Sequence, residues 1–194
     1  MAFNKLKNAR DSNIKVVYGD EVMFTKHSNK GRDWRSSKGN NTIVAQTDYY
    51  TDYMAVAAAI SKEVGTEVVY TSKRAINRDS FVDFLRILRR RNGQRRLALF
   101  MDNLAVHKAK PVVEAMEKLN IEPIWNAVYS PQFNPIEMSF SKLKLLYKKD
   151  RLERLTKKKP LPMDSMIRRA FSKVTKENIS NYVEHCYRLL RHAS

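Results

Sequence analysis

Residues 96–102 read Arg-Leu-Ala-Leu-Phe-Met-Asp, a run of five apolar residues between an arginine and an aspartate. A half-buried strand alternates apolar and polar residues, so an unbroken apolar run of this length indicates a strand buried on both faces. Such a strand lies inside a sheet that helices cover on both sides. We therefore expect residues 97–101 to form a strand in the middle of an α/β domain.

The segments on either side of this strand alternate between helix and strand. Residues 79–91 carry phenylalanines and leucines at helical spacing and stop at Asn92-Gly93, which predicts a helix. A second helix near residues 110–119 and a short strand near residues 121–125 follow. This alternation is typical of parallel strands that are joined by crossover helices.

Three more strands are predicted before this region. Residues 14–22 alternate as a strand does, with Asp20 on one side and Glu21 on the other. Two strands are expected near residues 53–60 and 67–71. Antiparallel strands that are followed by alternating strands and helices predict an α/β fold, a mixed sheet flanked by helices.

The segment SPQFNPIE, residues 130–137, predicts the start of another helix. Asn134 suits the N-cap position and Pro135 the first helical position. Beyond Asp150 the pattern breaks, and two further helices are expected near the end of the chain. We therefore divide the chain into a short N-terminal lead (1–13), a core domain (14–150), a basic linker (151–163) and a C-terminal helical segment (164–194).

The charge of the chain points to a polyanionic partner. Lysine and arginine number 37 against 20 aspartates and glutamates, which gives a formal net charge of +17. A positive field of this size attracts nucleic acid. Nine basic residues fall between Lys142 and Lys159, and this density favours contact with phosphates.

Other classes of protein are excluded by the composition. The single cysteine, Cys186, rules out an internal disulfide framework and a cysteine-rich zinc site. The longest apolar run, residues 54–60, is too short to cross a bilayer, and the N-terminus does not resemble a signal peptide. We expect an intracellular protein that binds no membrane.

Three carboxylates lie where predicted elements begin or end. Asp20 is late in the first strand, Asp102 follows the buried strand, and Glu137 is in the first turn of a helix. Three acidic groups converging at one edge of a sheet would repel each other unless a divalent cation held them. Each residue also has a structural alternative: a solvated strand edge for Asp20, a turn for Asp102, and a capping box with Asn134 for Glu137.

The joint pattern resembles a known family. FMDNLAVHK (residues 100–108) and YSPQFNPIE (129–137) resemble the second half of the catalytic core of mariner-superfamily transposases. The 34 residues between Asp102 and Glu137 match the spacing of one branch of that superfamily. VVYGDEVMF (16–24) resembles the segment that holds the first aspartate of the family.

Further segments extend the likeness over roughly residues 14–150. Trp34 and Gly39 resemble the tryptophan-containing stretch of the family, and SFVDFLRIL (80–88) resembles its first core helix. Phe133 stands where the family usually has leucine, an apolar exchange that leaves the catalytic residues untouched. Asp33, Asp48 and Asp52 compete with Asp20 for the first catalytic position, but only Asp20 lies on a clean strand pattern.

The resemblance implies a DDE transposase core with an RNase H-like fold, a five-stranded mixed sheet flanked by helices. Asp20, Asp102 and Glu137 would then be catalytic and would bind two Mg²⁺ ions, which Mn²⁺ can replace, for DNA cleavage and strand transfer. The implied partners are transposon ends and target DNA, with no small-molecule cofactor. The resemblance also implies a homodimer, which in a eukaryote would act in the nucleus.

Two alternatives stay open. Family members carry helix-turn-helix domains upstream, and only 13 residues precede the first predicted strand here, so we expect a truncated chain or a fragment. A domesticated remnant that only binds DNA is therefore one alternative. Another RNase H-like nuclease, with a preference for RNA–DNA hybrids, is the other.

Several basic residues and one histidine are secondary candidates. His107, five residues after Asp102, is interpreted as a packed core histidine, with an approach to the metal site as the alternative. Glu137, Ser141, Lys144 and Lys148 follow one stripe of the last core helix. The candidate DNA-binding residues are Lys142, Lys144, Lys148 and Lys149.

Overall fold

A five-stranded mixed sheet in the order β3-β2-β1-β4-β5 forms the centre of the computed structural model, which describes residues 2–25, 53–157 and 161–193. The strands are β1 (Lys15–Thr25), β2 (Tyr53–Ser61), β3 (Gly65–Ser72), β4 (Leu97–Met101) and β5 (Ile121–Trp125). The first three strands pair antiparallel, and β4 and β5 run parallel to β1. The predicted mixed sheet is confirmed.

Strand β4 is buried on both faces, as its apolar run predicted. Ala98 and Phe100 belong to the core on one side of the sheet, and Leu97, Leu99 and Met101 belong to the core on the other. All five side chains are at most 2% exposed. Because both faces of β4 pack into a core, the strand has no side that faces solvent, and this explains its uninterrupted apolar sequence.

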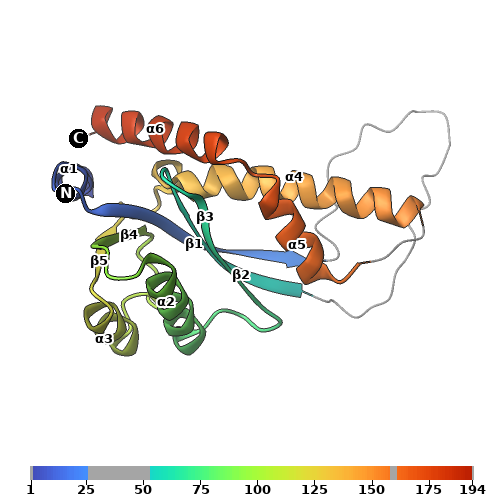
Figure 1. Ribbon diagram of the computed structural model, residues 1–194, viewed down its shortest axis with the longest axis horizontal. Helices are drawn as coiled ribbons and strands as arrows, with labels where there is room; N and C mark the ends of the chain where they lie inside the picture. Colours follow the sequence, from blue (N-terminus) through green and yellow to red (C-terminus); the bar gives the residue numbers. More distant parts are fainter. Residues whose placement is uncertain (1, 26–52, 158–160, 194) are drawn as a thin grey trace.

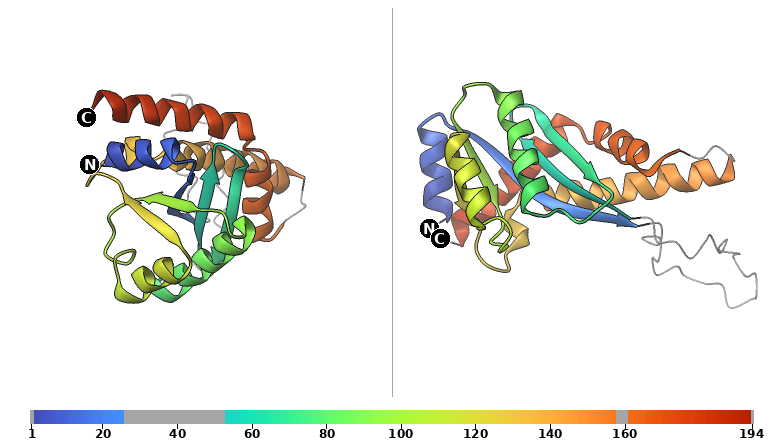
Figure 2. Two further views of the ribbon diagram at one scale, coloured as in Figure 1. Left: turned by 60° about the vertical axis from the view of Figure 1, so that its left-hand side comes forward. Right: turned by 90° about the horizontal axis from the view of Figure 1, so that it is seen from below.

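Helices cover both faces of the sheet (Figures 1 and 2). On one face lie α2 (Arg78–Asn92) and α3 (Lys110–Lys118). The other face carries α1 (Ala2–Asp11), α4 (Pro135–Thr156), α5 (Met163–Ser172) and α6 (Lys176–His192). A short 3₁₀ helix, η1 (Pro131–Phe133), immediately precedes α4.

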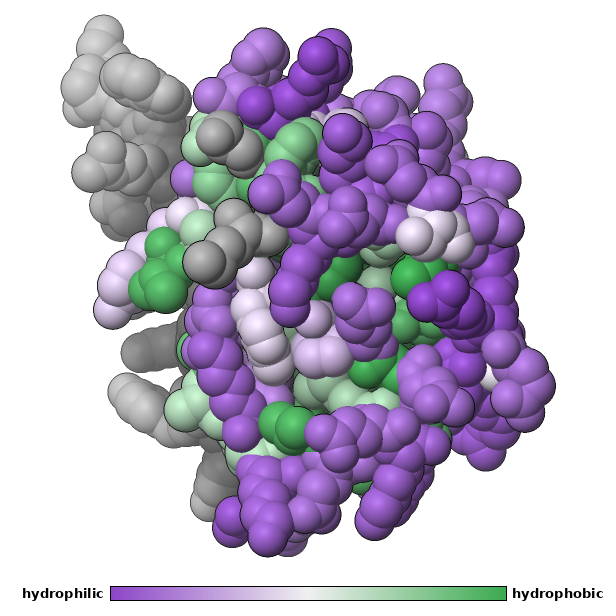
Figure 3. Space-filling view, turned by 90° about the vertical axis from the view of Figure 1, so that its left-hand side faces the viewer, coloured by the Kyte–Doolittle hydropathy of each residue, from purple (hydrophilic) through white to green (hydrophobic). Residues whose placement is uncertain are grey.

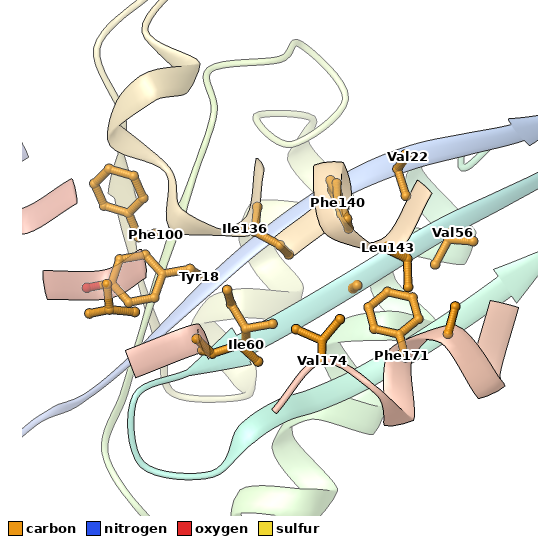
Figure 4. Packing of buried hydrophobic residues seen from close by; sticks show 14 of the residues in the cluster. Tyr18, Val22, Val56, Ile60, Phe100, Ile136, Phe140, Leu143, Phe171 and Val174 are labelled. Atoms are coloured by element: carbon orange, nitrogen blue, oxygen red, sulfur yellow. The ribbon is translucent and has the colours of Figure 1, made fainter. Parts of the chain in front are cut away.

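Helix α4 is fixed to the sheet by its apolar stripe. Ile136, Phe140 and Leu143 point from α4 toward side chains of β1 and β2, among them Val22 and Val56 (Figure 4). All of these side chains are buried. Burying each one contributes roughly 1.5–3 kcal/mol, which makes the placement of α4 stable and the position of its first turn well defined.

The structure differs from the predicted organisation at both ends of the core. Residues 2–11 form a helix, α1, whose Leu6 and Ala9 are buried against the sheet. Helix α4 continues to Thr156 rather than ending near Asp150, so the first residues of the range 151–163 are helical. Asp150 and Arg154 form an ion pair one turn apart, 3.0 Å between their atoms, and this supports the added turns.

The described part of the chain holds no helix of the length and apolarity needed to cross a membrane. Figure 1 places the first and last described helices, α1 and α6, at the same end of the molecule. Seen from that end, the surface is largely hydrophilic around a central group of apolar side chains (Figure 3). The stretch with Trp34 and Gly39, which resembles the tryptophan-containing stretch of the family, lies outside the described residues.

Candidate active site

The pairing of β1 with β4 brings Asp20 and Asp102 onto neighbouring strand positions. Tyr18 lies opposite Phe100 in the parallel ladder, and each aspartate follows its aromatic residue by two positions. Because side chains two residues apart in an extended chain share a face, both aspartates are directed to the face that α4 covers. The register thus sets the two carboxylates side by side.

Glu137 reaches the same place because the start of α4 is attached to β1. The side-chain amide of Asn134 donates a hydrogen bond to the carbonyl oxygen of Gly19, at 3.2 Å. Its side-chain oxygen accepts from the N–H of Ile136, at 3.4 Å, as an N-cap does. The backbone N–H of Asn134 donates to Pro131, so the capping box that was the alternative for Glu137 does not form.

All three carboxylates line one pocket. The pocket has a volume of about 310 Å³, and Asp20, Asp102 and Glu137 share its wall with three asparagines, Asn103, Asn126 and Asn134. The amide of Asn103 donates to the carbonyl oxygen of Asn126, and the amide of Asn126 donates to that of Ser130, at 2.6 Å. These bonds fix the loop that forms the outer wall.

Acidic groups gather around Asp20 in the pocket. Burial raises the pKa of Asp20 to about 8. A hydrogen bond from the backbone N–H of Glu21 lowers this pKa, and the nearby carboxylates of Glu21, Asp102 and Glu137 raise it. A divalent cation would remove the repulsion, and carboxylate oxygens are the ligands that Mg²⁺ and Mn²⁺ prefer. The residues of the pocket therefore fit a divalent metal in their chemistry.

The side chains are not arranged as a closed coordination sphere. Among the residues that the structure describes, no group of three or more His, Cys, Asp or Glu side chains converges closely enough to hold a metal ion as it stands. The competing aspartates Asp33, Asp48 and Asp52 lie outside the described residues. The placement of Asp20 on β1 and its pairing with β4 are the structural features in its favour.

His107 is both buried and in contact with the site, so the two interpretations of this residue are not exclusive. Its side chain is fully buried, with Nε2 2.9 Å from Oε1 of Glu21 and Nδ1 2.8 Å from Oδ1 of Asp102. Its ring packs on Phe81 of α2, with 4.4 Å between the ring centroids. Burial lowers the pKa of His107, but the hydrogen bonds to Asp102 and Glu21 outweigh burial and raise it to about 10.

Glu21 is the residue whose role the sequence did not reveal. Its strand position places it on the face opposite to Asp20, and no role in the site was predicted for it from the sequence. Its side chain is only 17% exposed and contacts His107. The sequence feature that could have indicated a role for Glu21 is its position on the same face of β1 as Val17 and Gly19, which are buried.

The candidate DNA-binding lysines of α4 have different surroundings. Lys144 and Lys149 are exposed, and Lys148 is half-buried. Lys142 is also half-buried, and its ammonium group donates to the side-chain oxygen of Asn178 in α6. It therefore ties two helices together, whereas Lys144 and Lys149 extend into solvent.

Comparison with known proteins gives a family and a fold. A family model described as "DDE superfamily endonuclease" matches residues 15–157, most of the chain. No curated protein matches the sequence. The structure resembles the Mos1 transposase paired-end complex with left transposon end, with a TM-score of 0.59 and 17% identity over 95% of this chain and 60% of that one.

Two other solved structures share the fold. The Mos1 transposase catalytic domain with raltegravir and Mn gives a TM-score of 0.53 at 17% identity, covering 95% of this chain and 90% of that one. A simian T-cell lymphotropic virus intasome in complex with PP2A regulatory subunit B56 gamma gives 0.58 at 16%, covering 81% and 46%.

These likenesses confirm the RNase H-like fold that the resemblance implied. The chain spans about 60% of the length of the Mos1 transposase chain in the paired-end complex. Asp20, Asp102 and Glu137 all fall within the matched range. Together, the matched range and the fold show that this chain belongs to the DDE superfamily endonucleases.

Proposed function

We propose that this chain carries the active site of a transposase that cuts DNA strands and joins them to target DNA with divalent metal ions. The observation that carries the proposal is the meeting of Asp20, Asp102 and Glu137 in one pocket, from three separate elements. Solved structures of the Mos1 transposase include a paired-end complex with the left transposon end, a strand transfer complex, and paired-end complexes with Mn or Mg. They support this choice of substrate and metal.

In this proposal the residues of the chain have distinct tasks. Asp20 on β1, Asp102 directly after β4 and Glu137 in the first turn of α4 would hold the metal ions. Bound metal ions supply an activated water or 3′-hydroxyl for attack and stabilise the leaving oxygen. Because the nucleophile comes from water or DNA, no serine or tyrosine of the chain has to form a covalent bond to the substrate.

The surroundings of the pocket suit a polyanionic substrate. The carboxylates form a negative centre in a protein of net charge +17, which draws phosphates toward the metal-binding residues. Exposed Lys144 and Lys149 extend from α4, the helix that carries Glu137 in its first turn. A DNA backbone lying along α4 would bring a phosphate to the pocket.

The test is nicking of supercoiled plasmid by the purified chain in Mn²⁺ or Mg²⁺. We expect cleavage that requires metal and that falls at least a hundredfold in Asp102→Asn and Glu137→Gln. Glu122→Gln is the matched control, since Glu122 is an exposed carboxylate on β5, away from the pocket. Binding of plasmid without metal-dependent cleavage would favour a DNA-binding remnant, and preferential cleavage of an RNA–DNA hybrid would favour another nuclease.

A further inference from the structure

His107 lies behind the proposed metal-binding carboxylates, on the side away from the pocket. Its two ring nitrogens face two different carboxylates, Oδ1 of Asp102 at 2.8 Å and Oε1 of Glu21 at 2.9 Å. The side chain is fully buried, so water does not compete for these contacts. A buried neutral imidazole is satisfied by one acceptor and one donor, so two acidic partners are more than core packing requires.

One oxygen of Asp102 has two contacts among the residues that the structure describes. Oδ1 lies against Nδ1 of His107 and also accepts from the backbone N–H of Leu104, at 3.3 Å. Asp102 also lines the pocket. Because β4 ends at Met101, the ladder does not fix the carboxylate of Asp102, and the histidine takes over this task.

Asp20 is held in a parallel way. Its Oδ1 accepts from the backbone N–H of Glu21, at 2.7 Å, and the carboxylate of Glu21 contacts Nε2 of His107. A continuous chain of contacts thus runs from Asp20 through Glu21 and His107 to Asp102. In each aspartate, Oδ1 makes the contact that belongs to this chain. The imidazole ring of His107 therefore links β1 to the residue that follows β4.

The ring of His107 is itself fixed in place. Phe81 of α2 stacks against it with an interplanar angle of 31°, and Phe84 packs against Phe81. The backbone N–H of His107 donates to the carbonyl oxygen of Leu104, at 3.1 Å, which closes the turn after β4. A ring clamped between an aromatic face and two carboxylates cannot turn without breaking several contacts.

We propose that His107 is a positioning residue, which through Glu21 and Asp102 sets the distance and orientation of the two aspartates for metal binding. The inference rests on the proposed function, because it presupposes that Asp20 and Asp102 bind metal. It assigns His107 no contact with DNA. Partners that orient metal ligands in this way typically change metal affinity by about 10- to 100-fold when they are removed.

Three substitutions at position 107 separate positioning from packing. His107→Phe keeps a ring on Phe81 but removes both nitrogens. His107→Asn places an amide nitrogen where Nδ1 faces Asp102, and His107→Gln places one where Nε2 faces Glu21. His185→Asn, at an exposed histidine of α6, is the matched control for a lost imidazole.

The measurement is Mn²⁺ binding by the purified chain, followed by electron paramagnetic resonance of free Mn²⁺, with thermal unfolding to check the fold. We expect His107→Phe to weaken binding by about 10- to 100-fold. His107→Asn should recover most of this loss and His107→Gln little of it, while His185→Asn binds as the wild type does. In a plasmid-nicking assay, excess Mn²⁺ should restore the rate of His107→Phe.

The outcomes distinguish this inference from the proposed function. Equal Mn²⁺ affinity of a folded His107→Phe and the wild type overturns the positioning role and leaves the metal site intact. Recovery by His107→Gln but not by His107→Asn also overturns it, because contact with Asp102 would then be irrelevant. A wild-type chain that binds no Mn²⁺ overturns both proposals together.

Discussion

The side-chain amide of Asn134 is hydrogen-bonded to the carbonyl oxygen of Gly19, 3.2 Å away, and Gly19 directly precedes Asp20. This bond attaches the first turn of α4 to the strand that carries the first aspartate of the site. Asn134 is 2% exposed, so both groups are shielded from water. This amide therefore adds to the apolar contacts of α4 in setting the distance between Glu137 and Asp20.

We expect Asn134→Ala to lower stability and to weaken metal binding together. The free energy of unfolding should fall by about 1–3 kcal/mol, since a buried carbonyl loses its donor and α4 loses its N-cap. Urea denaturation and Mn²⁺ titration measure the two effects. Asn120→Ala, at an asparagine on the turn before β5, is the control; unchanged Mn²⁺ affinity in Asn134→Ala would show that Glu137 is placed by other contacts.

A buried ion pair between Lys15 and Glu67 gives a second prediction, on stability alone. Their charged atoms lie 2.5 Å apart and both side chains are at most 5% exposed. Asn92 accepts from the ammonium group and Ser61 donates to the carboxylate. The cluster connects β1, β2, β3 and α2 on the side of the sheet away from α4.

Removing one partner of this pair should cost more than removing both. Glu67→Leu and Lys15→Met each leave an uncompensated buried charge, which lowers the free energy of unfolding by about 3–5 kcal/mol. The double variant should regain most of this loss, because an apolar pair replaces the charges. Denaturant unfolding of the wild type, the two single variants and the double variant measures the interaction as a double-mutant cycle. A loss in the double variant equal to the sum of the two single losses would contradict the pairing.

The raised pKa of Asp20 predicts a dependence of stability on pH. Its ordinary value is 3.8 and burial raises it to about 8, so the folded protein binds this proton more tightly than the unfolded chain does. The free energy of unfolding should therefore fall as the pH rises from about 4 to about 8, by at most about 1.4 kcal/mol per pH unit from this group.

Metal-free protein is the sample for this measurement, by urea unfolding between pH 5 and pH 8. Asp20→Asn should flatten the pH dependence below about pH 6.5, above which His107, whose pKa is raised from 6.5 to about 10, keeps a slope of the same sign. Asp83→Asn, at an exposed aspartate of α2, should leave the profile unchanged. Added Mn²⁺ should oppose the loss at pH 8, because binding to the folded state adds stability. A profile that keeps its slope below about pH 6.5 in Asp20→Asn would place the titrating group elsewhere.

The fold could be read from the sequence wherever burial alone decides the pattern. The apolar run of β4 and the helical spacing in α2 both depend on which face meets the core, and both were predicted correctly. Helix α1 was missed because only Leu6 and Ala9 of its residues are buried, too few to produce a period. The length of α4 was underestimated because its last turns depend on ion pairs rather than on apolar contacts.

The sequence predicted only part of the site. Asp20, Asp102 and Glu137 were found through motifs and element ends, and the structure brings them into one pocket. The link through Glu21 and His107 depends on the register between β1 and β4 and on the turn after β4. Neither is encoded in local spacing, because the two residues are 86 positions apart.

Exposed lysines on α4 give a last prediction, on DNA affinity. Lys144 is exposed and lies two turns after Glu137 on the same helix, so it should contact a phosphate of DNA bound at the pocket. Lys144→Ala should reduce the slope of log affinity against log salt by about 0.9, one phosphate contact. Lys118→Ala, an equal loss of charge on α3 across the sheet, should leave the slope unchanged in a salt series of fluorescence anisotropy titrations. Equal slopes for the two variants would mean that the positive charge acts over the whole surface and that DNA does not follow α4.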